Sequence, residues 1–110
     1  MGMPSPMPES NLIIDVATRD DEVTFILVGE LDLGSGGRVR SMLGLVDPNA
    51  QTVALDMAGV TFVDSSGLVA IVQAHLRLQH EGRVLELRHV PNGVQQVLAL
   101  TELIDYLRVV

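Results

Sequence analysis

The order of strand-like and helix-like segments constrains this chain more than any other sequence feature. Two apolar segments rich in β-branched residues, 12–16 and 23–28, are joined by a short polar link, which is typical of an antiparallel pair. After them, helical and strand patterns alternate to the last residue. Such alternation requires crossover connections between parallel strands. The sequence therefore predicts one α/β domain with a sheet that is at least partly parallel.

The strands differ in how much of their surface they are expected to bury. Almost every residue of 23–28 is apolar, so we expect this strand to be central and covered on both faces. A third strand is expected at 52–57, and the chain continues through another apolar segment at 60–63. Alternation at 83–88 predicts a fourth strand, and 107–110 is expected to form a last edge strand.

Apolar residues at helical spacing predict helices over 35–46, 66–79 and 94–100, and a short fourth helix starting at 101. Ser35 is the expected N-cap of the first helix. The glycines in this helix lower its intrinsic stability, so tertiary packing must hold it in place. The expected apolar face of the second helix consists of Leu68, Val69, Ile71, Val72, Leu76 and Leu78.

Composition excludes several function classes. Seven arginines and no lysine oppose fourteen acids, a net charge of -7, which argues against nucleic acid or an anionic membrane as the main partner. No cysteine is present, so disulfides, thiol nucleophiles and cysteine metal sites are excluded. The apolar runs are far shorter than the roughly 20 residues that cross a bilayer. We expect a cytoplasmic protein with a disordered, proline-rich tail over 1–10 and one domain over 11–110.

Two weaker patterns are better explained by structure than by chemistry. The glycine-rich segment 34–37 follows a strand, but a dinucleotide fingerprint requires glycine where Val39 stands, and a phosphate loop requires a lysine. His75 and His80 are five residues apart and cannot share a helix face at the usual ligand spacing. We expect His75 to be partly buried and hydrogen-bonded, and we predict neither a metal nor a cofactor for this chain.

The segment 64–67, Asp-Ser-Ser-Gly, follows an apolar strand and precedes an amphipathic helix. Asp64 or Ser65 is expected to cap that helix, and Gly67 permits close approach of the backbone. One cap leaves a hydroxyl group without an assigned structural role. A hydrolase nucleophile is not indicated, because neither Ser65 nor Ser66 lies in a Gly-x-Ser-x-Gly pattern, so no catalytic residue is predicted.

Modification is the other functional interpretation of these serines. A hydroxyl at an exposed helix N-terminus is accessible to a kinase, and the helix dipole accommodates a phosphate there. At about 6 Å and an effective dielectric near 20, the neighbouring Asp64 repels each unit of phosphate charge by roughly 3 kcal/mol before salt screening. A phosphate is therefore expected to leave the fold intact while altering an interface built over it.

The sequence resembles the STAS domain of bacterial anti-sigma factor antagonists. Three segments carry the resemblance in order and spacing: Gly-Glu-Leu-Asp at 29–32, Val-Thr-Phe-Val-Asp-Ser-Ser-Gly-Leu at 60–68, and Leu-Ala-Leu-Thr-Glu-Leu-Ile at 98–104. The resemblance covers residues 12 to 110, and Asp-Ser-Ser-Gly-Leu is its most specific element. It implies a small mixed β-sheet with helices packed mainly on one side.

The resemblance also implies a function in partner switching. Unphosphorylated members bind an anti-sigma factor that is an ATP-dependent serine kinase, and so release the sigma factor. The kinase then phosphorylates the serine after the aspartate, here Ser65 with Ser66 as second choice, and a PP2C-type phosphatase reverses the modification. The implied partner-binding neighbours of the phosphorylation site are Asp32, Asp64, Ser66, Gly67, Leu68 and Val69.

Three positions depart from the family pattern. Val69 stands where glycine is frequent, Gln73 where another small residue is common, and Gly36 in place of the usual alanine. Val69 and Gln73 lie early in the helix that would contact the partner, so they are expected to affect which kinase is recognised. An unphosphorylated STAS scaffold, or a soluble subunit of a membrane transport assembly, is the alternative function. Nucleotide binding by the domain itself has no supporting motif.

Overall fold

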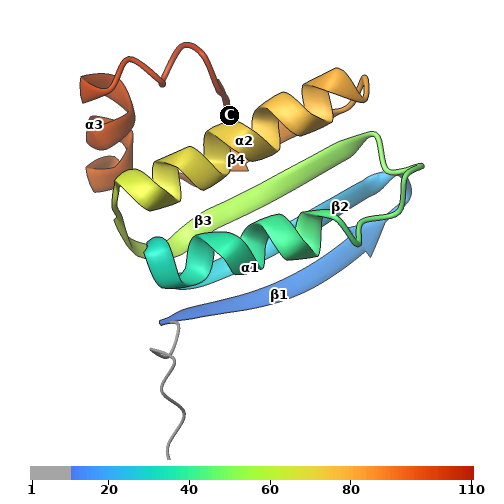
Figure 1. Ribbon diagram of the computed structural model, residues 1–110, viewed down its shortest axis with the longest axis horizontal. Coiled ribbons are helices and arrows are strands. Elements are labelled where there is room, and N and C mark those ends of the chain that lie inside the picture. Colours follow the sequence, from blue (N-terminus) through green and yellow to red (C-terminus); the bar gives the residue numbers. More distant parts are fainter. Residues whose placement is uncertain (1–10) are drawn as a thin grey trace, which may run out of the picture.

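The computed structural model describes residues 11–110, and the tail expected over 1–10 lies outside the described residues. Five strands form one sheet in the order β1-β2-β3-β4-β5; β1 and β2 are antiparallel, and the other neighbouring pairs are parallel. Figure 1 shows β1, β2 and β3 side by side. The elements in chain order are β1 (Leu12–Arg19), β2 (Glu22–Leu31), α1 (Leu33–Leu43), β3 (Thr52–Val63), α2 (Ser65–His80), β4 (Val84–Arg88), α3 (Asn92–Leu100) and β5 (Arg108–Val109).

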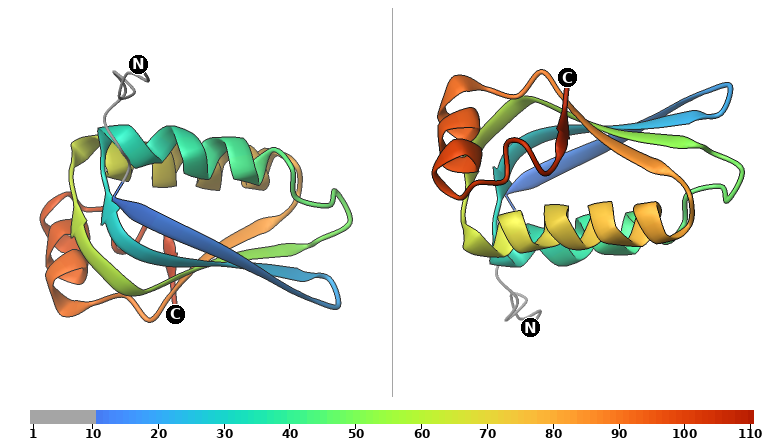
Figure 2. Two further views of the ribbon diagram at one scale, coloured as in Figure 1. Left: turned by 90° about the horizontal axis from the view of Figure 1, so that it is seen from below. Right: turned by 90° about the horizontal axis from the view of Figure 1, so that it is seen from above.

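The helices are arranged mainly on one side of this sheet. Figure 2 shows α1 and α2 side by side in a layer over one face, while α3 lies at the end of the sheet where β3 finishes. The mixed sheet and the one-sided helix layer confirm the predicted α/β class. Among residues 11–110, no helix combines the length and apolar character needed to span a membrane.

The core lies between the sheet and the layer formed by α1 and α2. Each large apolar side chain removed from water there stabilises the fold by about 1.5–3 kcal/mol. Side chains from five of the elements are almost completely buried: Phe25, Leu27, Leu31, Leu55, Met57, Ile71, Leu78, Leu87 and Leu98.

Strand β2 is covered on one face, so the prediction of burial on both faces was wrong. Phe25 and Leu27 are buried, whereas Ile26 and Val28 between and after them are 37% and 45% exposed. Successive side chains of a strand point to opposite faces, and α1 and α2 cover one of these. In this protein an entirely apolar segment therefore forms a central strand, although only one face of that strand is covered by helices.

The helices also differ from their predicted bounds. Helix α1 begins at Leu33 and ends at Leu43, earlier at both ends than the expected 35–46. On α2, Val69 and Leu76 are about half exposed instead of belonging to the core face. The expected fourth helix near 101 is a turn in which Glu102 has a φ of +62°, a left-handed conformation that ends helical geometry.

The sheet face opposite the helices carries a charged cluster that joins three strands. Arg88 on β4 donates hydrogen bonds to Glu22 on β2, at 3.1 Å through Nη1, and to Glu86 on its own strand. Arg108 on β5 donates to Glu86 at 2.9 Å. The hydrogen bonds from Arg88 hold the pKa of Glu22 and of Glu86 below their ordinary value, and the two carboxylates raise the pKa of Arg88.

Candidate functional site

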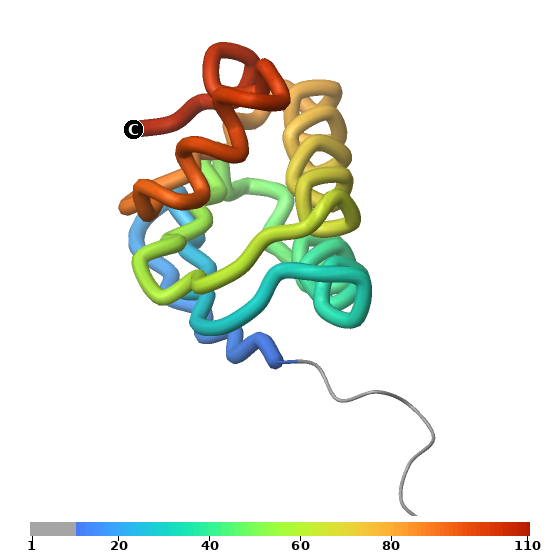
Figure 3. The backbone as a smooth tube through the Cα atoms, turned by 90° about the vertical axis from the view of Figure 1, so that its left-hand side faces the viewer, coloured from blue at the N-terminus to red at the C-terminus, as the bar shows by residue number. Residues whose placement is uncertain are grey.

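Two aspartates follow neighbouring parallel strands at the same edge of the sheet. Leu31 at the end of β2 is paired in register with Val63 at the end of β3. The backbone N–H of Asp64 donates to the carbonyl oxygen of Leu31 at 3.2 Å, which joins the two strand ends. Figure 3 shows the β2–α1 and β3–α2 connections side by side at this end of the molecule. Asp32 and the Asp-Ser-Ser-Gly segment are therefore neighbours in space.

Asp32, and not Ser35, is the N-cap of α1. Its Oδ1 accepts hydrogen bonds from the backbone N–H groups of Gly34 and Ser35 at 3.0 and 3.2 Å. Ser35 is the third residue of the helix and completes a capping box: its Oγ accepts from the Asp32 N–H and donates to the carbonyl oxygen of Glu30, both at 2.8 Å. The predicted cap was wrong because the completely buried hydroxyl of Ser35 acts from inside the first turn.

Asp64 is the N-cap of α2, one of the two residues expected there. Its carboxylate accepts a hydrogen bond from the backbone N–H of Gly67 at 2.9 Å. Ser65 is exposed and Ser66 is half-buried. Within residues 11–110, neither serine hydroxyl makes a hydrogen bond, so neither has a structural role as a cap. Among the described residues, the cap of α2 is therefore formed by Asp64 and by neither serine hydroxyl.

Gly67 sets the distance between α2 and the end of β2. A Cβ atom at this position would lie 2.2 Å from the carbonyl oxygen of Leu31, far closer than any non-bonded contact. The next residue, Leu68, is directed into the core and is 9% exposed. Gly67 and Leu68 therefore fix the place of the serines without facing solvent themselves.

A shallow pocket of about 230 Å³ lies between the first turns of α1 and α2. It brings together Asp32, Ser65, Ser66 and Val69 from the predicted site. The carboxylate of Asp64 faces the α2 backbone as its cap, and Gly67 and Leu68 are buried below. The complete lining is Asp32, Leu33, Gly36, Gly37, Arg40, Ser65, Ser66 and Val69.

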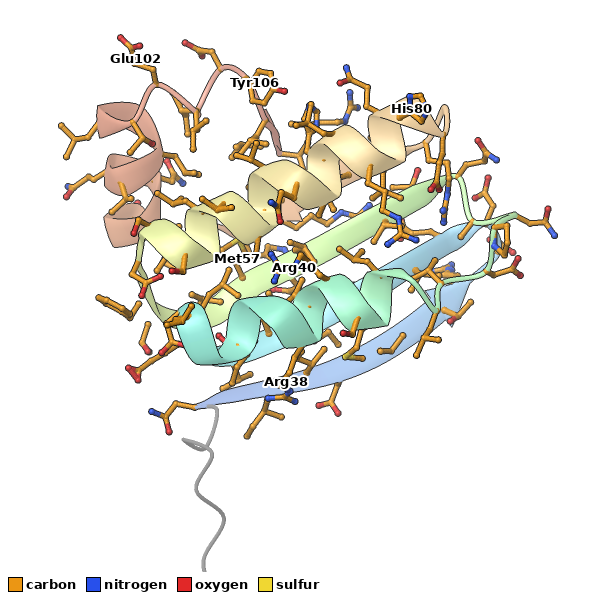
Figure 4. The ribbon with its side chains drawn as sticks, in the orientation of Figure 1. Arg38, Arg40, Met57, His80, Glu102 and Tyr106 are labelled. Atoms are coloured by element: carbon orange, nitrogen blue, oxygen red, sulfur yellow. The ribbon has the colours of Figure 1, made fainter. Side chains whose placement is uncertain are left out.

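Four lining residues were not among the predicted site residues: Leu33, Gly36, Gly37 and Arg40. Arg40 lies on the side of α1 that faces α2, whereas Arg38 lies toward β1 (Figure 4). Nη1 of Arg40 donates to Oε1 of Gln73 on α2 at 2.8 Å. Leu33 is 81% exposed at the rim of the pocket. The sequence could have predicted the position of Arg40 from its spacing, because it is four residues after Gly36 and therefore lies on the same helix face.

The histidines lie away from this pocket. The rings of His75 and Tyr106 meet edge to face with centroids 5.0 Å apart, and His75 is half-buried as expected. Its expected hydrogen bond is not present among the contacts of the described chain. Nδ1 of His89 lies 3.2 Å from Oδ1 of Asp56. Residues 11–110 contain no group of three side chains suited to hold a metal ion.

Several solved structures share this fold. An anti-sigma factor antagonist from Mycobacterium paratuberculosis has a TM-score of 0.73 at 16% identity, covering 97% of this chain and 89% of its own. The Bacillus cell fate determinant SpoIIAA in its phosphorylated form has a TM-score of 0.67 at 19% identity, covering 90% of each chain. A sulfate transporter family protein from Wolinella succinogenes has a TM-score of 0.76 at 20% identity, covering 84% and 79%. At these identities the likeness shows the fold.

The longer protein Mglu matches with 28% identity and a TM-score of 0.65 over 71% of this chain, which spans 19% of the Mglu chain. The family assignment rests on the sequence as a whole, because the model of the STAS domain matches residues 14–110. That match includes both aspartates, both serines and every residue of the pocket. The chain belongs to the STAS domain family.

Proposed function

We propose that this protein is an anti-sigma factor antagonist controlled by phosphorylation of Ser65. The observation that carries the proposal is the exposed Ser65 hydroxyl, which lines a pocket with Asp32 while Asp64 caps the helix. Membership of the STAS family supports it, as do fold relatives described as anti-sigma factor antagonists, one of them solved in phosphorylated form. The unphosphorylated protein binds an anti-sigma factor that is a serine kinase, and the sigma factor is released.

The switch is a phosphoryl transfer from ATP carried by the kinase. A bond forms between Oγ of Ser65 and the γ-phosphorus, the bond from that phosphorus to the ADP oxygen breaks, and the hydroxyl proton is released. The net charge then changes from -7 to about -9 at the pocket mouth. A loss of only 1.4 kcal/mol in binding weakens the complex tenfold. Repulsion from acidic groups of the partner and displacement of its contacts are sufficient for such a loss.

The proposal assigns the remaining chemistry to other proteins. A PP2C-type phosphatase hydrolyses the phosphoserine and restores binding, and the nucleotide belongs to the kinase. The chain itself acts in the cytoplasm as a binding protein without a catalytic residue or a cofactor. Asp32, Ser66, Leu33 and Val69 surround Ser65 at the pocket and are the proposed contacts of the kinase.

The proposed function is tested by intact mass and site mapping after incubation with ATP, magnesium and candidate anti-sigma factors related to histidine kinases. One phosphate is expected on Ser65 of the wild-type protein and on the Ser66→Ala variant. Ser65→Ala is expected to gain none while still binding the kinase. Transfer to Ser66 in preference to Ser65 would contradict the assignment of the site.

The alternative is an unphosphorylated STAS subunit of a membrane transport assembly, and one observation favours it: the likeness to a sulfate transporter family protein. Stable binding to a membrane complex, with Ser65 unmodified in cells, would support this alternative and contradict the switch. Binding to an anti-sigma factor that is lost in Ser65→Asp but kept in Ser65→Ala would contradict the alternative.

A further inference from the structure

Arg40 and Ser65 come from different helices and line the same pocket. Of the eight lining residues, Asp32 and Arg40 carry charge, so Arg40 is the cation of this pocket. It reaches the pocket from the second turn of α1, on the side that faces α2 (Figure 4). The pocket that holds the proposed phosphorylation site therefore also holds a guanidinium group.

The two carboxylates near Ser65 have structural tasks. Asp32 accepts two backbone hydrogen bonds on Oδ1, from the N–H groups of Gly34 and Ser35. Asp64 accepts the N–H of Gly67. Both carboxylates therefore stay in place when a phosphate arrives, and each repels it. The N-terminus of α2 offsets part of this repulsion, and a nearby cation would offset more of it.

Arg40 has the charge and the donors to act as this cation. A guanidinium group carries five N–H donors, and the hydrogen bond to Oε1 of Gln73 uses one of them. Its planar fork matches two oxygens of a phosphate, and such charge-assisted pairs are among the strongest hydrogen bonds in proteins. Gln73 lies on α2 eight positions after Ser65, about 12 Å farther along the helix axis, so Arg40 must exchange this hydrogen bond for the phosphate.

We propose that Arg40 binds the phosphate of phosphorylated Ser65 within the chain. This inference rests on the proposed function for the identity of the modified serine. Arg40 then determines which surface the modified protein presents to its partners, because it holds the phosphate against α1 and keeps it from projecting freely from α2. Arg40 is a positioning residue of the switch and has no role in the transfer itself.

The test uses phosphoserine placed at position 65 by translational incorporation, which requires no kinase. The phosphate is titrated by phosphorus NMR in the wild-type background and in Arg40→Gln, Arg40→Lys and Arg77→Gln. Arg77 is the matched control, because it lies on the same α1–α2 seam beside Arg40 and outside the pocket. Asp32 and Asp64 face the phosphate equally in all four proteins.

The expected result is a phosphoserine pKa that rises by roughly 0.5–1 unit in Arg40→Gln, since a nearby cation favours the dianion. Arg40→Lys, which keeps the charge, is expected to restore part of this shift, and Arg77→Gln to match the wild type. Equal titration of Arg40→Gln and Arg77→Gln would overturn the role of Arg40. Absence of kinase transfer to Ser65 would overturn the proposed function instead and would leave this titration unaffected.

Discussion

At the scale of single residues, Asp32 and Ser35 show how one hydrogen-bonded unit anchors the site. Asp32 caps α1, and the buried hydroxyl of Ser35 joins the cap to the end of strand β2 by donating to the carbonyl oxygen of Glu30. Two other residues of the Gly-Glu-Leu-Asp motif are also fixed by packing. Leu31 is completely buried, and a Cβ atom at Gly29 would lie 1.9 Å from the carbonyl oxygen of Asn11.

Replacing Asp32 tests the cap separately from partner binding. Asp32→Ala is expected to lower the free energy of unfolding by about 1–2 kcal/mol, because it leaves two N–H groups of α1 without their acceptor. Asp32→Asn retains an acceptor oxygen and is expected to lose much less. Urea unfolding monitored by circular dichroism measures both. Equal losses in the two variants would show that charge, and not capping geometry, is the contribution of Asp32.

Gly67 provides a second prediction at this scale. Gly67→Ala is expected to destabilise the fold by about 1–3 kcal/mol, because its Cβ would lie 2.2 Å from the backbone of Leu31. Gly93→Ala is the control: no atom lies within 4 Å of its Cβ position in the first turn of α3, so a neutral or slightly stabilising change is expected. Urea midpoints of the two variants compare them directly. A wild-type midpoint for Gly67→Ala would contradict the close approach of α2 to β2.

At the scale of elements, the charged cluster on the open face of the sheet joins β2 to β4 across β3. Arg88 pairs with Glu22 two strands away and with Glu86 beside it. Between them the register places Ala54 of β3, whose small side chain is completely buried. The cluster contributes to holding the strands in register on the face that no α1 or α2 side chain covers.

This cluster predicts how stability depends on pH. The folded pKa of Glu22 and of Glu86 lies below the ordinary value of 4.5, so the folded protein binds fewer protons than the unfolded chain in that range. The stabilisation is complete above pH 4.5 and is lost as the pH falls through the lowered folded values. Arg88→Met is therefore expected to be less stable than the wild type at pH 7, with the difference shrinking as the pH drops below 4.5.

Urea midpoints at a series of pH values measure this difference. Arg77→Met is the control, because its partner Glu81 is exposed and owes its lowered pKa mainly to Arg83. The control is expected to remain near the wild type at every pH. A gap between wild type and Arg88→Met that stays constant below pH 4.5 would contradict the assigned ion pairs.

At the scale of the whole molecule, the site lies outside the core that stabilises the fold. The pocket is formed by the first turns of α1 and α2, while the large buried side chains lie between these helices and the sheet. Phosphate at Ser65 is therefore expected to leave the fold intact, because it adds charge outside the buried core. A binding switch needs this separation, since its two states must share one fold.

Protein carrying phosphoserine at position 65 tests this expectation against the unmodified chain. Backbone NMR shifts are expected to change around the pocket, in Asp32, Gly36, Gly37 and the start of α2, and to remain constant in β4 and β5. Changes spread through β4 would show that phosphorylation rearranges the fold. In that case the switch would act through conformation and not through the charge and shape of one surface.

The sequence by itself determined the parts that depend on neighbouring residues. Among residues 11–110, the patterns located the five strands and three helices, and Asp-Ser-Ser-Gly-Leu identified the family and one correct cap. The third strand was expected over 52–57 and runs on to Val63, through the apolar segment at 60–63. Hydrophobic patterns and caps are local, because they arise from contacts within about one turn of helix or along a single strand. The alternation of elements therefore predicted a mixed sheet, but it did not predict the order of the strands within that sheet.

Only the tertiary structure decided which distant groups meet. It left one face of β2 open, assigned the cap of α1 to Asp32, and placed Arg40 in one pocket with Ser65, 25 positions later in the chain. These facts depend on the order and register of strands and on the seam between two helices. Local periodicity carries no information on strand order or on the helix seam. A helix with the same apolar pattern can pack beside different neighbours and at different angles to the sheet. The residues of the site are therefore brought together by tertiary packing.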